Sequence, residues 1–290
     1  MKKDFIRLTL SLLILVSIFY IFQQKQIAKE SITYFPIDPT VTFPKANTTL
    51  TFSKKRFDEY SILWESNSSI NKLAYLRQDM SLLYANGKLI STMGEWKQNT
   101  LELSEKKTVV ERESNYLQAI TFHYAEIHDA SERIFSSQKI SADNLYIINS
   151  KFENTPIFFH HPNNLVEKDW AKTLDKEAFD YAEYAYRQGL KKFHISADQY
   201  HTKLLLTELT PYNDAPLPHF SKEQSAKIIG QLTEGLYKNY FLGIIKEDGT
   251  IADPIGSSIP IILISDNHLL ILFTTADDEP IVLRQQISTL

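Results

Sequence analysis

SLLYANGKLIST, residues 81–92, places the dipeptide Asn86-Gly87 between two runs that are rich in apolar residues. Asn and Gly both tolerate positive φ values, so this dipeptide suits the two-residue turn of a β-hairpin. Outward from it, further strand-like runs follow at TLELS, KTVVERE, YLQAITFHYAEI and NLYIINS, with polar residues between them. This pattern predicts an antiparallel sheet within residues 57–160.

Two helices are predicted in the second half of the chain. The first begins at Asn164, whose side chain can cap a helix together with Glu167, and Gly189 is a typical stop. The second begins at Ser221 and ends at Gly243. The short, Ile-rich runs IPIILIS, HLLILFTT and PIVLRQQI then predict buried strands.

The predicted fold class is α+β: an N-terminal transmembrane helix is followed by an extracytoplasmic domain with antiparallel sheet and two main helices. The predicted boundaries are a transmembrane signal anchor at 1–24, an extended stalk at 25–56, a β-rich lobe at 57–160 and an α+β lobe at 161–290. The two lobes can also form one domain. Three prolines disfavour helix in the stalk, and its second half alternates like an edge strand.

FIRLTLSLLILVSIFYIF, from Phe5 to Phe22, is the most apolar stretch of the N-terminal region. The uncharged part from Leu8 is too short for a hydrocarbon core of about 30 Å, but a helix from Phe5 to Gln24 reaches about that length. Arg7 then lies near one end, where its side chain can extend to the lipid headgroups. The following residues, QQKQIAKES, make a poor cleavage site. A retained anchor is therefore favoured over a cleaved signal or a soluble helix.

Charged residues on the two sides of this segment predict its orientation. Lys2, Lys3 and Arg7 precede or begin the segment, and Lys25 and Lys29 follow it. Positive charge is retained on the cytoplasmic side. We therefore expect a single-pass protein of the cell membrane, with a cytoplasmic N-terminus and an extracytoplasmic C-terminal domain.

The composition excludes several classes of function. A formal charge of −4, with 31 basic and 35 acidic side chains, gives no basic surface for nucleic acid. Because there is no cysteine, thiolate nucleophiles, disulfides and Cys-ligated zinc are excluded. No cofactor is predicted, since neither a dinucleotide fingerprint nor a phosphate loop is present. In general style, the basic N-terminus, single apolar segment and cysteine-free exterior are similar to bacterial surface proteins of Gram-positive organisms.

The strongest candidate metal site lies in FHYAEIHD, residues 122–129. Glu126 and His128 share one face of a strand and can both bind a metal ion. A third ligand would come from His160 or His161. Alternatively, the first two residues form the solvated face of a strand, and the histidine pair belongs to a chain reversal.

Two acidic loops are a second candidate site. TADDEP contains Asp277 and Asp278, and KEDGTIADP contains Asp253. If the loops meet, their oxygen atoms can bind a cation or serve as paired carboxylates in glycoside chemistry. Alternatively, both loops are solvated turns, where such residues are common.

A binding, sensing or scaffolding module at the cell surface is the function that these observations favour, without a defined biochemical activity. Enzyme activity stays uncertain and is the less favoured reading. The expected partners are the lipid bilayer, through the N-terminal helix, and a protein at the membrane surface. The alternative is a metal-assisted hydrolase that acts near the membrane and uses Glu126, His128 and either His160 or His161.

Overall fold

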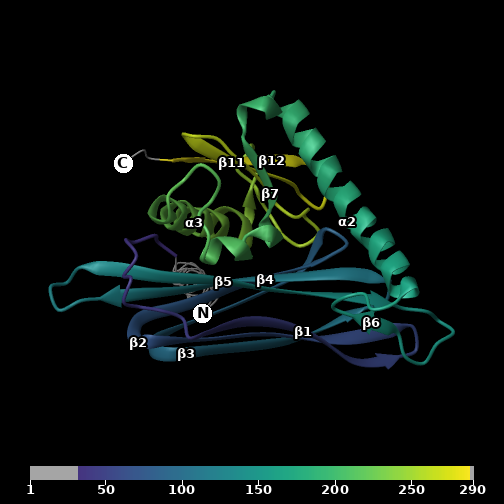
Figure 1. Cartoon of the computed structure of the whole chain (residues 1–290). Coiled ribbons are helices and arrows are strands. Elements are labelled where there is room, and N and C mark those ends of the chain that lie inside the picture. Colours follow the sequence, from purple (N-terminus) through teal and green to yellow (C-terminus); the bar gives the residue numbers. More distant parts are fainter. Residues whose placement is uncertain (1–31, 288–290) are drawn as a thin grey trace, which may run out of the picture. The chain divides into compact units, whose positions relative to one another are not determined.

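The computed structural model describes residues 32–287 and has mostly β structure (Figure 1). Strands make up 48% and helices 23%, with two helices and a half-barrel sheet. The predicted α+β class is therefore wrong. The physical reason for this error lies in the charged segments, because TLELS and the KTVVE part of KTVVERE, which are predicted as separate short strands, belong to one strand of 24 residues. The predicted membrane span, 5–22, lies outside the described residues.

Six strands form the larger sheet: β1 (Lys45–Arg56), β2 (Glu59–Ala85), β3 (Lys88–Glu111), β4 (Asn115–His128), β5 (Ile134–Ile148) and β6 (Ile157–Phe159). They pair in the order β1-β2-β4-β5-β6, and β3 lies on the other edge of β2. The predicted hairpin is confirmed. Asn86 and Gly87 connect β2 to β3, and their φ values are 46° and 85°.

A bend in β2 curves this sheet. Residues 59–69 of β2 pair with β1, and residues 76–85 pair with β4 along the same edge. The ladder to β3 is interrupted between Ser69 and Ala74. β1, which occupies the second half of the predicted stalk, therefore lies across the interior from β5. There the backbone N–H of Leu50 donates to the Asp143 carboxylate at 2.7 Å.

The rest of the chain contains a second sheet and two helices. Its elements are α2 (Leu165–Lys192), β7 (Thr202–Leu205), α3 (Lys222–Leu236), β8 (Ile244–Ile245), β9 (Ile251–Ala252), β10 (Ile261–Ile264), β11 (His268–Thr274) and β12 (Pro280–Gln286). Short helical turns lie at Ala197–Gln199, Leu206–Glu208, Thr210–Asn213 and Tyr237–Phe241. The second sheet has the antiparallel order β12-β11-β10-β7. None of the helices within 32–287 is long and apolar enough to cross a membrane.

Alternating side chains of β11 bury both faces of the second sheet. Leu270 and Leu272 pack with Ala182 of α2. Ile271 and Phe273 point the other way, into the principal core. This core also contains side chains of β2, β4, β5 and α3, so the half-barrel and the second sheet enclose it together. Residues from 32 onward form one compact unit.

Both predicted helix starts are confirmed, and one predicted stop is wrong. The side chains of Asn164 and Ser221 accept backbone N–H groups of the first turns of α2 and α3. α2 continues past Gly189 to Lys192. Gly189 is needed for packing instead, because a Cβ there would lie 3.2 Å from a methyl group of Leu272.

Candidate functional site

The inward face of the half-barrel is polar in the middle and apolar toward both ends. On β4, Leu117 belongs to one apolar cluster and Ile127 to another. Between them lie Thr121 and His123, whose exposed fractions are 0% and 1%. Strand side chains alternate between faces, so the even-numbered residues of β4 point toward the principal core instead. Buried polar groups need hydrogen-bond partners, and the neighbouring strands supply them.

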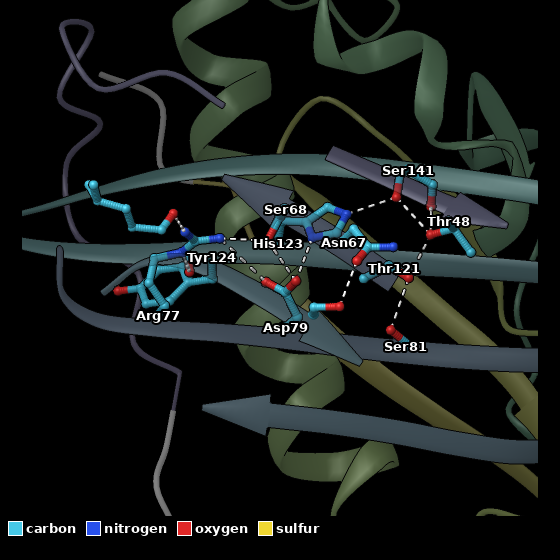
Figure 2. Close-up of polar contacts among 12 residues, drawn as sticks. Thr48, Asn67, Ser68, Arg77, Asp79, Ser81, Thr121, His123, Tyr124 and Ser141 are labelled. Atoms are coloured by element: carbon cyan, nitrogen blue, oxygen red, sulfur yellow. Dashed lines mark hydrogen bonds and ion pairs between the residues drawn. The ribbon is translucent and has the colours of Figure 1, made fainter. Parts of the chain in front are cut away.

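Three buried side chains form a hydrogen-bonded relay across β2, β4 and β5 (Figure 2). Asp79 Oδ2 lies 2.7 Å from His123 Nδ1. His123 Nε2 lies 2.8 Å from Ser141 Oγ. Adjacent strands bring them together, since Asp79 pairs with His123 in the β2–β4 ladder, and β5 follows on the other edge of β4.

Hydroxyl groups extend this relay to β1 and back to β2. Ser141 Oγ and Thr48 Oγ1 are 2.7 Å apart. Thr48 donates to Thr121 Oγ1 at 2.7 Å, and Thr121 Oγ1 is 2.9 Å from Ser81 Oγ (Figure 2). Four strands are thus connected through side chains in addition to their ladders.

Arg77 closes the other end of the network. It is fully buried, and its guanidinium donates to Ser68 Oγ at 2.6 Å and to the Leu101 carbonyl at 2.8 Å. Its charged head also lies 5.0 Å from the centre of the Phe43 ring. Burial lowers the pKa of Arg77, and the charge of Asp79, whose Oδ1 is 3.9 Å away, opposes that shift.

The relay has the order of a nucleophilic Ser-His-Asp arrangement, in which histidine can take the serine proton. Attack on a substrate also requires that a carbonyl carbon reach the hydroxyl oxygen. Ser141 is only 8% exposed, and Thr48 covers its hydroxyl from β1. In this conformation the hydrogen bonds of the relay therefore connect neighbouring strands, and the Ser141 hydroxyl is not accessible to a substrate.

Glu105 of β3 adds a buried carboxyl group beside this network. It lies opposite Ser66 in the β2–β3 ladder and is 9% exposed. Both Glu105 carboxylate oxygens, Asp79 Oδ1 and Ser66 Oγ have no hydrogen-bond partner among the described residues. Burial, together with the charges of Asp79 and Glu95, raises the pKa of Glu105 to about 8. The carboxyl group is therefore mostly protonated at pH 7.

An open pocket of about 380 Å³ lies outside the half-barrel, along the edge of β5. Its walls include Ile37, Val41, Phe43, Ile140, Tyr212 and Ile229. They come from the segment 37–43, which we call the strap, from β5, from the turn after β7 and from α3. Lys139 and Lys222 also line the pocket, which is mainly apolar with polar groups on its walls.

The residues of the predicted metal site do not come together. Glu126 Oε1 bonds His128 Nε2 at 2.5 Å, and the Tyr75 ring stacks on His128. His160 instead bonds the Asn144 carbonyl, whose ladder partner on β4 is eight residues from Glu126, about 26 Å along the strand.

His161 follows His160 in an exposed turn and offers no third ligand at Glu126. Among residues 32–287, no three His, Asp or Glu side chains are grouped so that they could hold a metal ion.

The acidic loops do approach each other, but lysines lie among their carboxylates. Lys246 Nζ is 3.0 Å from Glu279, and Lys192 Nζ is 3.5 Å from Glu247 and 3.8 Å from Glu279. The hydrogen bond to Glu279 raises the pKa of Lys246.

Asp253, Asp277 and Asp278 belong to the two loops, and Asp253 accepts the backbone N–H of Ile255 at 2.8 Å. Gly256, just after Asp253, lies against Ala276 of the other loop. The arrangement is an ion-pair network on paired turns and not a set of converging oxygen ligands.

Sequence reasoning missed Arg77, Asp79, His123 and Ser141. His123 lies inside FHYAEIHD, but on the face opposite Glu126. A signal was present in the sequence: Arg77, Asp79 and Ser81 take every second position of β2, between apolar or uncharged neighbours. Polar residues with that period, on a strand whose other face is apolar, predict a polar surface that is either solvated or buried against another polar strand.

No protein-family model matches this sequence, and neither a curated protein nor a solved structure matches it.

Proposed function

We propose that residues 32–287 form a binding module, which the apolar segment 5–22 holds in the cell membrane with the module on the outer side. The observation that carries the proposal is the pocket at the edge of β5, whose volume of about 380 Å³ falls in the range of small-molecule and side-chain sites. The Ser141 hydroxyl, in contrast, is covered. Binding at an open pocket therefore has more support than catalysis at a closed relay.

A fragment-binding experiment tests the pocket. We expect weakly binding apolar fragments with one polar group to bind the full chain in detergent micelles, as measured by ¹⁹F NMR of a fluorinated fragment set. Ala226→Phe places a ring in the pocket from α3, and it should abolish binding. The matched control is Ala197→Phe, at an exposed position on a short turn away from the pocket. Fragment binding that is equal in both variants, or absent from the unsubstituted chain, contradicts the proposal.

A further variant separates binding from catalysis. Ser141→Ala removes the hydroxyl of the relay, and we expect it to leave fragment affinity unchanged within about twofold, because Ser141 does not line the pocket. Hydrolysis of a panel of ester and peptide substrates that disappears with Ser141→Ala would favour an enzyme instead.

The membrane attachment has its own test. A protease-sensitive tag placed after Leu290 should be cut by protease added to intact cells, because the segment 5–22 with Lys2 and Lys3 before it favours an outward C-terminus. Protection of the tag in intact cells, with cleavage after lysis, would reverse the proposed orientation. A chain that lacks residues 1–24 should fold and bind fragments but lose its role in cells.

A further inference from the structure

Within the described part of the chain, no continuous strand pairs with the outer edge of β5 along its middle part. Instead, separate segments of the chain form hydrogen bonds with individual backbone N–H and C=O groups at this edge. The Ser136 N–H donates to the Pro36 carbonyl at 2.8 Å, and the Asp38 N–H donates to the Ser136 carbonyl at 2.9 Å. Further along, the Asn213 side-chain amide accepts the Ile140 N–H at 2.8 Å and donates to the Ile140 carbonyl at 2.7 Å. Both partners imitate a neighbouring strand, in the first case with parallel orientation.

Gln138 lies between these two covered positions. In an antiparallel ladder, the residues that direct N–H and C=O to one side recur every second position. Ser136 and Ile140 direct both groups outward, so Gln138 does the same. Among residues 32–287 no hydrogen bond is made to these outward groups of Gln138 by the strap, by Asn213 or by α3.

The strap stops pairing at this point because it turns. Continued parallel pairing would need the Asp38 carbonyl to accept from Gln138 and the Thr40 N–H to donate to it. Instead, the Asp38 carbonyl accepts the Val41 N–H at 3.1 Å. The Thr40 N–H donates to the Asp38 side chain at 2.9 Å. Pro39, which has no N–H, occupies a central position of this turn.

The pocket lies at this uncovered place. It is lined by both sides of the strap turn, by residues 137–140 of β5 and by α3. In a parallel pair, side chains of opposed residues lie on the same face of the sheet. The Gln138 side chain points to α3, where it donates to the Ala226 carbonyl at 2.7 Å. A residue placed opposite Gln138 would therefore direct its side chain toward the pocket walls formed by Ala226 and Ile229.

We propose that the pocket binds a peptide segment of a partner protein, one residue of which lies opposite Gln138 in extended conformation and places an apolar side chain in the pocket. The residue before it accepts the Gln138 N–H, and the residue after it donates to the Gln138 carbonyl, as Pro36 and Asp38 do at Ser136. Main-chain hydrogen bonds supply affinity and the pocket supplies selectivity, which is the physics of strand addition. This inference rests on the proposed binding function and specifies its ligand.

A small compound that has both hydrogen-bonding groups and an apolar side chain is N-acetyl-leucine N-methylamide. Its acetyl carbonyl can accept from Gln138, and its methylamide N–H can donate to the Gln138 carbonyl. N-acetyl-leucine N,N-dimethylamide is the matched control, because it keeps the side chain and the carbonyl but lacks that N–H. We expect the dimethylamide to bind the full chain at least about fivefold more weakly, since a hydrogen bond of about 1 kcal/mol corresponds to that ratio. Titrations followed by ligand NMR give both Kd values.

Side-chain selectivity and pocket occupancy complete the test. The leucine and phenylalanine compounds should bind at least about tenfold more tightly than those of aspartate and lysine. Ala226→Phe should abolish binding, and Ala197→Phe should not. Equal affinity of the methylamide and the dimethylamide, with loss of both in Ala226→Phe, would overturn strand addition and leave the binding module intact. If none of the compounds or fragments binds to the pocket of the unsubstituted chain, both proposals are overturned.

Two other occupants of the same site would also overturn the inference. If a second copy fills the pocket, the full chain should self-associate as its concentration rises, and the methylamide should dissociate it. If residues 23–31 of the chain fill the pocket, their deletion should strengthen methylamide binding by at least about tenfold. Affinity that depends neither on protein concentration nor on residues 23–31 is the result expected for a separate partner.

Discussion

Glu105 of the half-barrel has unfavourable surroundings for a charge. Among residues 32–287, its two carboxylate oxygens have no hydrogen-bond partner, and Asp79 and Glu95 carry negative charge nearby. In the folded chain the pKa of Glu105 is raised to about 8 from the usual 4.5. At pH values below 4.5 the carboxyl group is mostly neutral in both the folded and the unfolded chain. Between pH 4.5 and pH 8 the unfolded chain releases the proton more readily than the folded chain, so the free energy of unfolding falls as pH rises. Above pH 8 this loss of stability is constant.

Glu105→Gln should therefore stabilise the protein in a pH-dependent way. The amide is neutral at every pH, so the gain should be near zero at pH 4 and should grow to the order of a few kcal/mol at pH 9. Urea unfolding of the full chain at both pH values measures it. Glu102→Gln on the same strand, where the side chain is exposed, is the matched control and should show no such trend. A gain that is equal at pH 4 and pH 9 would rule out this account of Glu105.

Residue by residue, the sequence predicted the site poorly because side-chain chemistry depends on which strands become neighbours. His123 lies inside FHYAEIHD, residues 122–129, but within that stretch the metal site is predicted from Glu126 and His128, which share the opposite face of the strand. His123 gains its partners from Asp79, 44 positions earlier, and from Ser141, 18 positions later. No spacing within one strand encodes such pairs, whereas a helix cap such as Ser221 is local and was predicted correctly.

Among the elements, the hairpin between β2 and β3 shows how a local signal takes on a tertiary role. Asn86-Gly87 forms the expected tight turn, and the turn also touches α2. A Cβ on Gly87 would lie 3.0 Å from the Ala178 carbonyl oxygen and 3.3 Å from the Tyr181 ring. The same turn thus fixes the register of the long strands and the position of the helix above them.

Gly87→Ala should lower the free energy of unfolding by more than backbone strain at the turn alone explains. Gly249 provides a matched control, because its φ of 81° is close to the 85° of Gly87, but nothing lies within 4 Å of an added Cβ. We expect Gly249→Ala to cost about 1 kcal/mol from backbone strain. Gly87→Ala should cost about 1 to 3 kcal/mol more, because the new methyl group displaces α2. Chemical unfolding of both variants measures the difference. If both variants lose the same free energy of unfolding, the contact between the turn and α2 does not contribute to stability.

Element types could be predicted from the sequence where patterns are local, and the fold class could not. Both helix starts and the hairpin follow from caps and turn residues. The error came from β3, whose charged second half, SEKKTVVE, pairs with the start of β2 on the far side of a bend. Charged residues on such a strand face solvent on one side, so its apolar content is low and its true length is hidden.

On the scale of the whole molecule, the principal core joins the parts of the chain on either side of residue 160, which the sequence allows to be two lobes or one domain. Phe122 of the half-barrel and Phe273 of the second sheet both belong to it. The even-numbered side of β4 is buried by α3 and the second sheet, and the Phe273 side of the second sheet is buried in the same core. Domains that share one core unfold together.

A substitution in the second sheet should therefore destabilise the half-barrel. Phe273 is 0% exposed, and Phe273→Ala should lower the free energy of unfolding by about 3 to 5 kcal/mol. If the core is shared, hydrogen exchange of the full chain should accelerate by similar factors in β11 and in residues 59–69 of β2, whose buried apolar side chains belong to a different cluster from Phe273. Phe152→Ala is the control, since that ring is 96% exposed and its loss should leave exchange unchanged in both places. Faster exchange that is confined to β10, β11 and β12 would instead mean that the second sheet unfolds separately, and the half-barrel would then have to be stable with its Phe122 face uncovered.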